Sequence, residues 1–243
     1  ILQDEPLRMR RLAGIFHIDI ASIHELWLFC GTDAGKVKKH MKEYCELMRQ
    51  YADTVFGAVF EGMPVMCLST PHSLRETEKV MMGMIADMRA VWPDAVIVRC
   101  CGLNNTTDCH RAYLTVLDAL EDVRNIFPDR CLVLQGELEF AAECRKLIDG
   151  GEDAAMRSLA PLTALKSDSE SGDLLETVCT YLLDCDGSVT KTAGKLFLHR
   201  NTIKYRLQRI TDMLEYHPAK MPEMMGLYRS AAVYRLLVAS KET

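Results

Sequence analysis

Two short helical patterns, separated by a break of three residues, constrain the fold of this chain more than any other feature. In the first, Val189, Ala193 and Leu196 recur at i, i+4 and i+7, so they share one face of a helix. Ser188 precedes them and is a suitable N-cap. The second pattern has apolar spacings of 4, 3 and 4, at Ile203, Leu207, Ile210 and Leu214. The sequence therefore predicts two short helices joined by a tight turn.

The second predicted helix has a polar face suited to nucleic acid. At about 100° per residue, Asn201, Tyr205 and Gln208 lie nearly opposite the apolar stripe, and Lys204 and Arg209 flank them. Arg suits guanine, Asn or Gln suits adenine, and Lys and Tyr suit the backbone. We therefore predict a DNA-binding helix-turn-helix whose contact residues are Ser188, Thr190, Lys191, His199, Arg200, Asn201, Thr202, Lys204, Tyr205, Arg206, Gln208 and Arg209.

The charge of this stretch is opposite in sign to that of the whole chain. Residues 188–210 hold six Lys or Arg and no Asp or Glu, whereas the chain has a net charge of −5. A basic surface of this kind attracts the phosphate backbone of DNA. The alternative is an ordinary solvent-exposed helical hairpin, which the change of sign disfavours.

This stretch and the helix before it resemble the C-terminal DNA-binding domain of the PucR/CdaR-type bacterial transcriptional regulators. The most specific segments are His199-Arg200-Asn201-Thr202 and Tyr205-Arg206-Leu207, supported by Leu174-Leu175-Glu176-Thr177 and Tyr181-Leu182. The helix-turn-helix is also similar to that of the Fis protein, although Phe197 stands where a turn glycine is common. The resemblance implies control of catabolic or transport genes in response to a metabolite, which a sensor domain upstream of Ile1 would bind.

The first two thirds of the chain predict an α/β domain. Its order of strand, helix, hairpin, helix, strand and helix is typical of a mixed sheet covered by helices. This layout resembles the GGDEF-like domain that precedes the DNA-binding domain in the same regulators. We expect strands near residues 26–30, 54–60, 64–69, 95–100 and 131–134, and helices near 7–15, 33–51, 73–92, 107–126 and 137–165.

The turn of the central hairpin argues against an enzyme. The related diguanylate cyclases carry Gly-Gly-Asp/Glu-Glu-Phe there, where carboxylates hold metal and glycines admit a nucleotide. This chain reads Phe60-Glu61-Gly62-Met63-Pro64, with one carboxylate and a proline in place of a ladder donor. A single carboxylate is a weak metal ligand set. We therefore expect no catalytic residue, metal or cofactor, and a degenerate domain that serves dimerisation or signal transmission.

Two domains with different charge are expected. The polar, Ser-rich segment from Lys166 to Asp173 is typical of a linker. Residues 173–243 hold ten Lys or Arg against eight Asp or Glu, so they are net positive in a net negative chain. We predict a degenerate GGDEF-like α/β domain at 1–166 and an all-α, Fis-like helix-turn-helix domain at 173–243.

Composition excludes several other classes of protein. No apolar run approaches the 18 residues of a membrane span, and the first residues do not form a signal peptide. The ten cysteines form no paired CxxC array. Cys100-Cys101 and Cys109-His110 leave a zinc site open, but buried thiols in a reducing cytoplasm are favoured. Because the chain starts on Ile, it is expected to be a piece of a longer protein.

The function expected from the sequence is that of a cytoplasmic, homodimeric regulator that binds double-stranded DNA and no membrane. A small-molecule effector would act through a domain absent from this chain. The alternatives are a cyclase-derived enzyme of nucleotide signalling and an interaction adaptor that does not bind DNA. The degenerate hairpin at Glu61-Gly62 argues against the first, and the six unopposed basic residues argue against the second.

Overall fold

A computed structural model describes residues 19–167 and 170–242, together with residues 7, 11 and 13–15. The chain divides into two compact units. The first contains the residues up to Leu120 and Arg130–Glu139, and the second contains Glu121–Asp129 and the residues from Phe140 onward. Of the short helix predicted for residues 7–15, the structure describes residues 7, 11 and 13–15, and these are helical.

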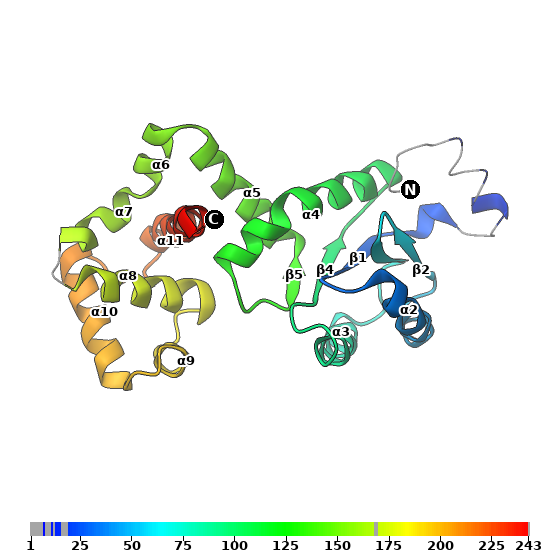
Figure 1. The fold of residues 1–243 in the computed structure, drawn as a ribbon, viewed down its shortest axis with the longest axis horizontal. Coiled ribbons are helices and arrows are strands. Elements are labelled where there is room, and N and C mark those ends of the chain that lie inside the picture. Colours follow the sequence, from blue (N-terminus) through cyan, green and yellow to red (C-terminus); the bar gives the residue numbers. More distant parts are fainter. Residues whose placement is uncertain (1–6, 8–10, 12, 16–18, 168–169, 243) are drawn as a thin grey trace. The chain divides into compact units, whose positions relative to one another are not determined.

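The first unit is built on a five-stranded mixed sheet with the strand order β2-β3-β1-β4-β5 (Figure 1). Strand β1 pairs antiparallel with β3 and β4, whereas β4 and β5 run parallel. All six residues of the central β1 are buried, which explains why its sequence is a continuous apolar run. The strands are β1 (Glu25–Cys30), β2 (Val55–Phe60), β3 (Met63–Leu68), β4 (Val96–Cys101) and β5 (Leu132–Leu134).

Helices cover both faces of this sheet. Figure 1 shows α2 (Ala34–Met48) and α3 (Leu74–Arg89) on one side and α4 (Thr106–Ile126) on the other. The side chains of Asp33 and Ser73 accept hydrogen bonds from N–H groups of the first turns of α2 and α3, as N-caps do. The predicted order of strand, helix, hairpin, helix, strand and helix is confirmed.

In the described part of the second unit, every regular element is a helix. Its core contains Leu174 and Val178 of α8, Ile203 and Leu207 of α10, and Leu227 of α11, all of them buried. A short 3₁₀ segment, η1 (Ile20–Ser22), precedes β1 in the other unit. The remaining helices are α5 (Gln135–Asp149), α6 (Glu152–Ser158), α7 (Ala160–Thr163), η2 (Ala164–Ser167), α8 (Ser171–Cys179), the π-helical η3 (Thr180–Asp184), α9 (Val189–Lys195), α10 (Arg200–Leu214) and α11 (Glu223–Glu242).

The two units do not divide at the Ser-rich segment. The end of α4, most of α5 and all of α6 and α7 belong to the second unit together with the C-terminal helices. The segment expected to be a linker is largely helical at both ends, since η2 includes Lys166 and α8 begins at Ser171. Residues 168–169 lie outside the described residues. The sequence predicted that residues 173–243 form a domain of their own. Whether they fold independently of the rest of the second unit stays a prediction.

None of the helices in the described part of the chain is long and apolar enough to cross a membrane.

Candidate nucleic-acid interface

The first helix of the predicted pair begins as its sequence indicates. The Ser188 hydroxyl accepts a hydrogen bond from the Lys191 N–H at 3.3 Å, which is N-cap geometry. The Thr192 hydroxyl, buried one turn later, donates to the Ser188 carbonyl at 2.8 Å. Ala193 is also buried, where α10 packs on α9. Helix α9 is thus fixed at its start by two side-chain bonds to one residue.

The turn between α9 and α10 is a Schellman motif. The Phe197 N–H donates to the Gly194 carbonyl at 3.4 Å, and the Leu198 N–H donates to the Ala193 carbonyl at 3.0 Å. These are the two bonds that define the motif, and its central residue adopts the left-handed conformation. Here that residue is Phe197, with φ of +55°, so the tight turn forms without the glycine common at this place.

Helix α10 is capped by a histidine. The Nδ1 atom of His199 accepts a hydrogen bond from the Asn201 N–H at 3.2 Å, so His199 is the N-cap of the helix. Because Nδ1 is the acceptor, the proton of the neutral ring lies on Nε2. Ile203, Leu207 and Ile210 are buried, as the period predicts. Sequence periodicity therefore gave the correct inner face of α10.

The opposite face of α10 is exposed. Arg200, Asn201 and Lys204 belong to its first turns, where residues of a recognition helix contact base edges. Tyr205 is 59% exposed, although an aromatic side chain is usually more buried than this. The amide of Gln208 donates to Asp212 at 2.8 Å, so one of its hydrogen-bonding groups is already engaged. The exposed side chains of the predicted site on α9, its cap and α10 are Thr190, Lys191, His199, Arg200, Asn201, Lys204, Tyr205 and Gln208.

Four of the six basic residues are held in ion pairs by acidic residues from outside the stretch, so the inference that all six are unopposed is wrong. Arg206 shows this most clearly, because its side chain is only 12% exposed and also donates to the Thr177 hydroxyl at 3.2 Å. The pairs are Lys191 with Asp186 (3.2 Å), Lys195 with Asp184 (3.2 Å) and Asp129, Arg206 with Asp173, and Arg209 with Glu170 (2.8 Å).

Two cations remain for a partner. Among the residues that the structure describes, neither Arg200 nor Lys204 has an ion-pair partner, and both are exposed. Both lie in the N-terminal half of α10. The sequence did not show which basic residues are paired, because the acidic partners of Arg206 and Arg209 precede them by 33 and 39 residues. No local pattern signals such pairs.

A buried carboxylate in η3 binds the last residue of α9. Asp184, in η3, has a side chain that is 5% exposed and accepts from both terminal nitrogens of Arg235 at 2.6–2.7 Å. Burial by itself would raise the pKa of Asp184, but the bonds from Arg235 and the charge of Lys195 outweigh it and lower that pKa. Arg235 also donates to the Ile126 carbonyl at 2.6 Å. The cluster therefore joins η3, α9, α11 and the end of α4 within the second unit.

The carboxylate in the hairpin turn of the first unit is engaged by a neighbouring side chain. Glu61 and Gly62 both have positive φ, of +48° and +82°, as in the common two-residue hairpin turn. The Glu61 carboxylate accepts a hydrogen bond from the Tyr113 hydroxyl at 3.2 Å. Pro64 lies opposite Val59 in the ladder and supplies no N–H there. The carboxylate thus has a partner within its own unit.

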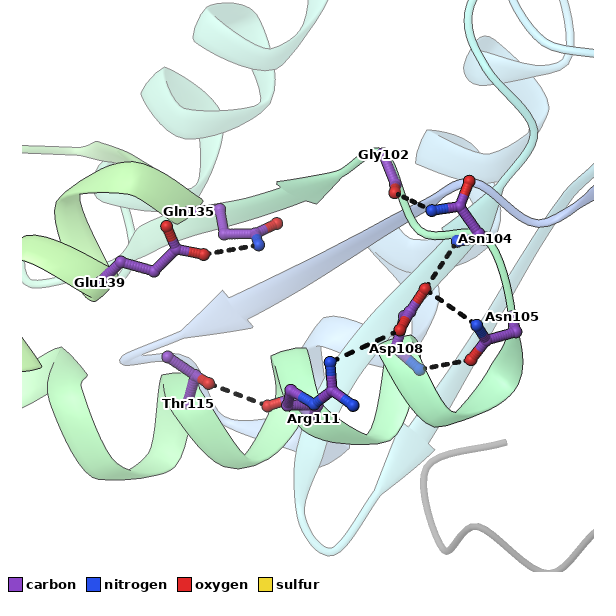
Figure 2. A network of polar contacts seen from close by, with 8 residues as sticks. All are labelled: Gly102, Asn104, Asn105, Asp108, Arg111, Thr115, Gln135 and Glu139. Atoms are coloured by element: carbon purple, nitrogen blue, oxygen red, sulfur yellow. Dashed lines mark hydrogen bonds and ion pairs between the residues drawn. The ribbon is translucent and has the colours of Figure 1, made fainter.

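A second polar cluster, at the start of α4, is a helix cap (Figure 2). The Asn105 side chain accepts from the Asp108 N–H at 2.9 Å, and the Asp108 carboxylate accepts from the side chain of Asn105 and the N–H of Asn104 at 3.0–3.1 Å. This exchange resembles a capping box. The cavity beside it, lined by Arg111 and Glu139 among others, holds about 130 Å³. That volume is too small for a nucleotide, since ligand sites measure about 300–1,000 Å³.

Eight of the ten cysteines are buried core residues, whereas Cys101 is exposed and Cys131 is partly buried. Cys100 and Cys109 are buried, and burial raises the pKa of their thiols to about 12 and about 11. A thiol with a raised pKa is a poor nucleophile and a poor metal ligand. Within residues 19–167 and 170–242 and the few described before them, no three His, Cys, Asp or Glu side chains are grouped to hold a metal ion.

Comparison with known proteins agrees with this geometry. Residues 174–233 match the family model of the PucR C-terminal helix-turn-helix domain, so this chain carries such a domain from α8 into α11. Uncharacterized proteins of Mycobacterium bovis and Mycobacterium tuberculosis are 37% identical to it over 91 residues. That alignment covers 35% of this chain, which spans only 22% of the length of those relatives.

One solved structure is similar over most of the chain. It is a regulator of polyketide synthase expression from Bifidobacterium adolescentis, with 15% sequence identity and a TM-score of 0.37. The similarity covers 95% of this chain and 91% of that one.

Proposed function

We propose that this chain, with its PucR C-terminal helix-turn-helix domain, is part of a bacterial transcriptional regulator of the PucR/CdaR type that binds double-stranded DNA. The observation that carries the proposal is the N-terminal half of α10. There Arg200, Asn201 and Lys204 are exposed at the start of a helix whose opposite face is buried, and no described carboxylate neutralises the two cations. A regulator of this kind works in the cytoplasm, where bacterial DNA lies.

The proposed docking places α10 in the major groove and α9 against the backbone. In helix-turn-helix proteins the N-terminal residues of the second helix contact base edges while the first helix crosses the phosphates. Arg200 then pairs with a guanine and Asn201 with an adenine. Thr190 and Lys191, exposed in the first turn of α9, face the backbone. Arg206 and Arg209 belong to the predicted site by sequence, but their pairing with Asp173 and Glu170 gives them a smaller share in binding.

The proposed complex contains two copies of the chain. One recognition helix contacts only a few base pairs, whereas helix-turn-helix dimers bind two half-sites about 34 Å apart or a multiple of that distance. We therefore expect a homodimer on an inverted repeat. Response to a metabolite is expected through a sensor domain outside this chain, and the first unit transmits that signal or assists dimerisation.

The experiment is a selection of binding sites from a randomised duplex pool, followed by electrophoretic shift of the selected duplex. We expect one preferred site with inverted symmetry, and a variant with Arg200→Ala and Asn201→Ala that shifts it at least ten-fold more weakly. The control is Met225→Ala, which alters an exposed side chain of α11. Failure of the unmodified chain to select any sequence would reject the proposal and leave the adaptor as the better explanation.

The nucleotide-signalling alternative has a separate test. Calorimetry of the chain with guanosine triphosphate, and with a cyclic diguanylate, is expected to give no heat of binding, because Glu61 is bonded to Tyr113 and Pro64 interrupts the ladder. A micromolar response that Glu61→Ala abolishes would favour the enzyme or a nucleotide receptor instead.

A further inference from the structure

The turn between α9 and α10 carries a phenylalanine that the fold does not use. The ring of Phe197 is 95% exposed, so it contributes almost nothing to the core. Its φ of +55° is a conformation that favours glycine, because a Cβ atom there approaches the following carbonyl oxygen. Four described residues other than glycine have positive φ, and of these Phe197 alone is apolar; the others are Glu61, Asp186 and Glu215. Neither packing nor backbone conformation accounts for an aromatic ring at this place.

The Schellman motif fixes where this ring projects. The bonds from the N–H groups of Phe197 and Leu198 to α9 hold the turn, and Leu196 and Leu198 on either side are partly buried. Phe197 therefore stands on the outer side of the turn, three residues before Arg200, at the end of α10 that is proposed to enter the major groove. In the proposed docking, a ring in this position lies at the wall of the groove.

The surrounding charge favours DNA over a protein as the occupant. From Lys195 to Ile210 the chain has five basic residues and no carboxylate. Two of them, Arg200 and Lys204, have no described ion-pair partner. Both follow the turn, in the first turns of α10. Within the major groove the apolar group available to an aromatic ring is the 5-methyl group of thymine.

We propose that Phe197 is a specificity-determining residue whose ring packs on the 5-methyl group of a thymine at the edge of each half-site. The inference rests on the proposed function, because it requires α10 to dock on DNA. It adds an apolar contact from the turn to the hydrogen bonds made by Arg200 and Asn201. Such a contact selects thymine over cytosine and over uracil, which lacks the methyl group.

The test combines a protein variant with a base analogue. The probe is the duplex selected by the unmodified chain, in which each thymine of one half-site is replaced in turn by deoxyuridine. We expect one position where the replacement weakens binding about four-fold, the value for one buried methyl group. The variant Phe197→Gly is expected to bind the thymine duplex several-fold more weakly and to be insensitive to deoxyuridine at that position. Met225→Ala, which removes another exposed apolar side chain of the same unit, is expected to change neither.

Thermal unfolding separates this role from a structural one. Glycine suits the left-handed conformation, so Phe197→Gly is expected to keep or raise the Tm while it weakens binding. A lowered Tm, or a shift from dimer to monomer in sedimentation, would assign the ring to the fold or to an interface between copies and overturn the inference. Equal deoxyuridine sensitivity in both proteins would also overturn it, while the proposed function would stand. If the unmodified chain selects no site, both fall.

Discussion

Helix α10 carries two groups of basic side chains that differ in whether they have an ion-pair partner. In the N-terminal half, Arg200 and Lys204 are exposed and have no ion-pair partner among the described residues. Farther along the helix, Arg206 and Arg209 are bound by Asp173 and Glu170 near the start of α8. The chain uses the second group to fasten α10 to α8 and leaves the first group for a partner. A count of basic residues overstates the surface available to DNA.

The largest effect is expected at Asp184, the buried carboxylate that binds Arg235 and Lys195. Asp184→Asn leaves the guanidinium of Arg235, 18% exposed, without a full negative partner, and we expect it to lower the free energy of unfolding by about 3 kcal/mol. Asp186→Asn is the matched control two residues away, because Asp186 is 65% exposed and pairs only with an exposed lysine. Denaturant unfolding of both variants measures the difference. Equal losses would show that burial does not distinguish the two carboxylates.

The same carboxylate predicts a dependence of stability on acid pH. The pKa of Asp184 is lowered below its ordinary value of 3.8 in the folded state, because Arg235 and Lys195 outweigh the burial that raises it. A group of this kind stabilises the fold above its unfolded pKa, and the stability is lost as the pH falls through the folded pKa. We therefore expect the free energy of unfolding to fall below about pH 4, and to fall less steeply in Asp184→Asn. Parallel acid limbs in the two proteins would contradict this.

The next largest effect tests whether the N-terminal half of α10 is the surface that reads the bases. Asn201→Ala is expected to weaken specific binding by about 1–3 kcal/mol and to relax the preference at one base position, since an Asn that bonds adenine twice is lost. Gln208→Ala is the comparison, because its amide is already bonded to Asp212 and a smaller loss is expected. Binding to the selected duplex and to an unrelated duplex measures both. An unchanged base preference in Asn201→Ala would place the reading face elsewhere.

A third pair of variants contrasts a basic residue held in an ion pair with one that has no described ion-pair partner. Arg206→Ala breaks bonds to Asp173 and Thr177, so we expect a loss of about 1–2 kcal/mol in stability and an unchanged salt dependence of DNA binding. Lys204→Ala, two residues earlier, is expected to change stability by less than about 0.5 kcal/mol. It should reduce the slope of log K against log salt by about 0.9, as one lost phosphate contact does. The reverse assignment of slope and stability would break the comparison.

The smallest effect is expected at the exposed pair beside α9. Asp186→Asn removes the carboxylate that holds Lys191 at 3.2 Å and leaves the lysine to the phosphates. Binding at low salt is expected to tighten by at most about 1 kcal/mol, the size of one charge interaction at 4 Å in water. The gain should vanish at high salt, because exposed charges are screened. A gain that persists at high salt would have another cause than Lys191.

Two turns of the molecule illustrate how far sequence reasoning reached. At Glu61-Gly62 the sequence predicted a tight hairpin, and the structure has one, but only the structure showed that Tyr113 binds the carboxylate. At Phe197 the missing glycine was visible in the sequence. The left-handed conformation and the exposed ring were not, because the Schellman bonds depend on how α9 ends.

What the sequence by itself determined is local. The N-cap Ser188, the inner face Ile203, Leu207 and Ile210, and the positions of the strands follow from interactions between residues a few positions apart. Apolar period and cap chemistry act over one or two helical turns, so a linear pattern records them.

Only the tertiary structure decided which basic residues of the described chain have ion-pair partners. Asp173 precedes Arg206 by 33 residues, and Asp129, one of the two partners of Lys195, precedes it by 66. An ion pair depends on the distance between two charges in space, and chain packing sets that distance independently of sequence separation. The sequence therefore specified where α10 begins and which way it faces, while packing divided its charges between holding the fold and meeting a partner.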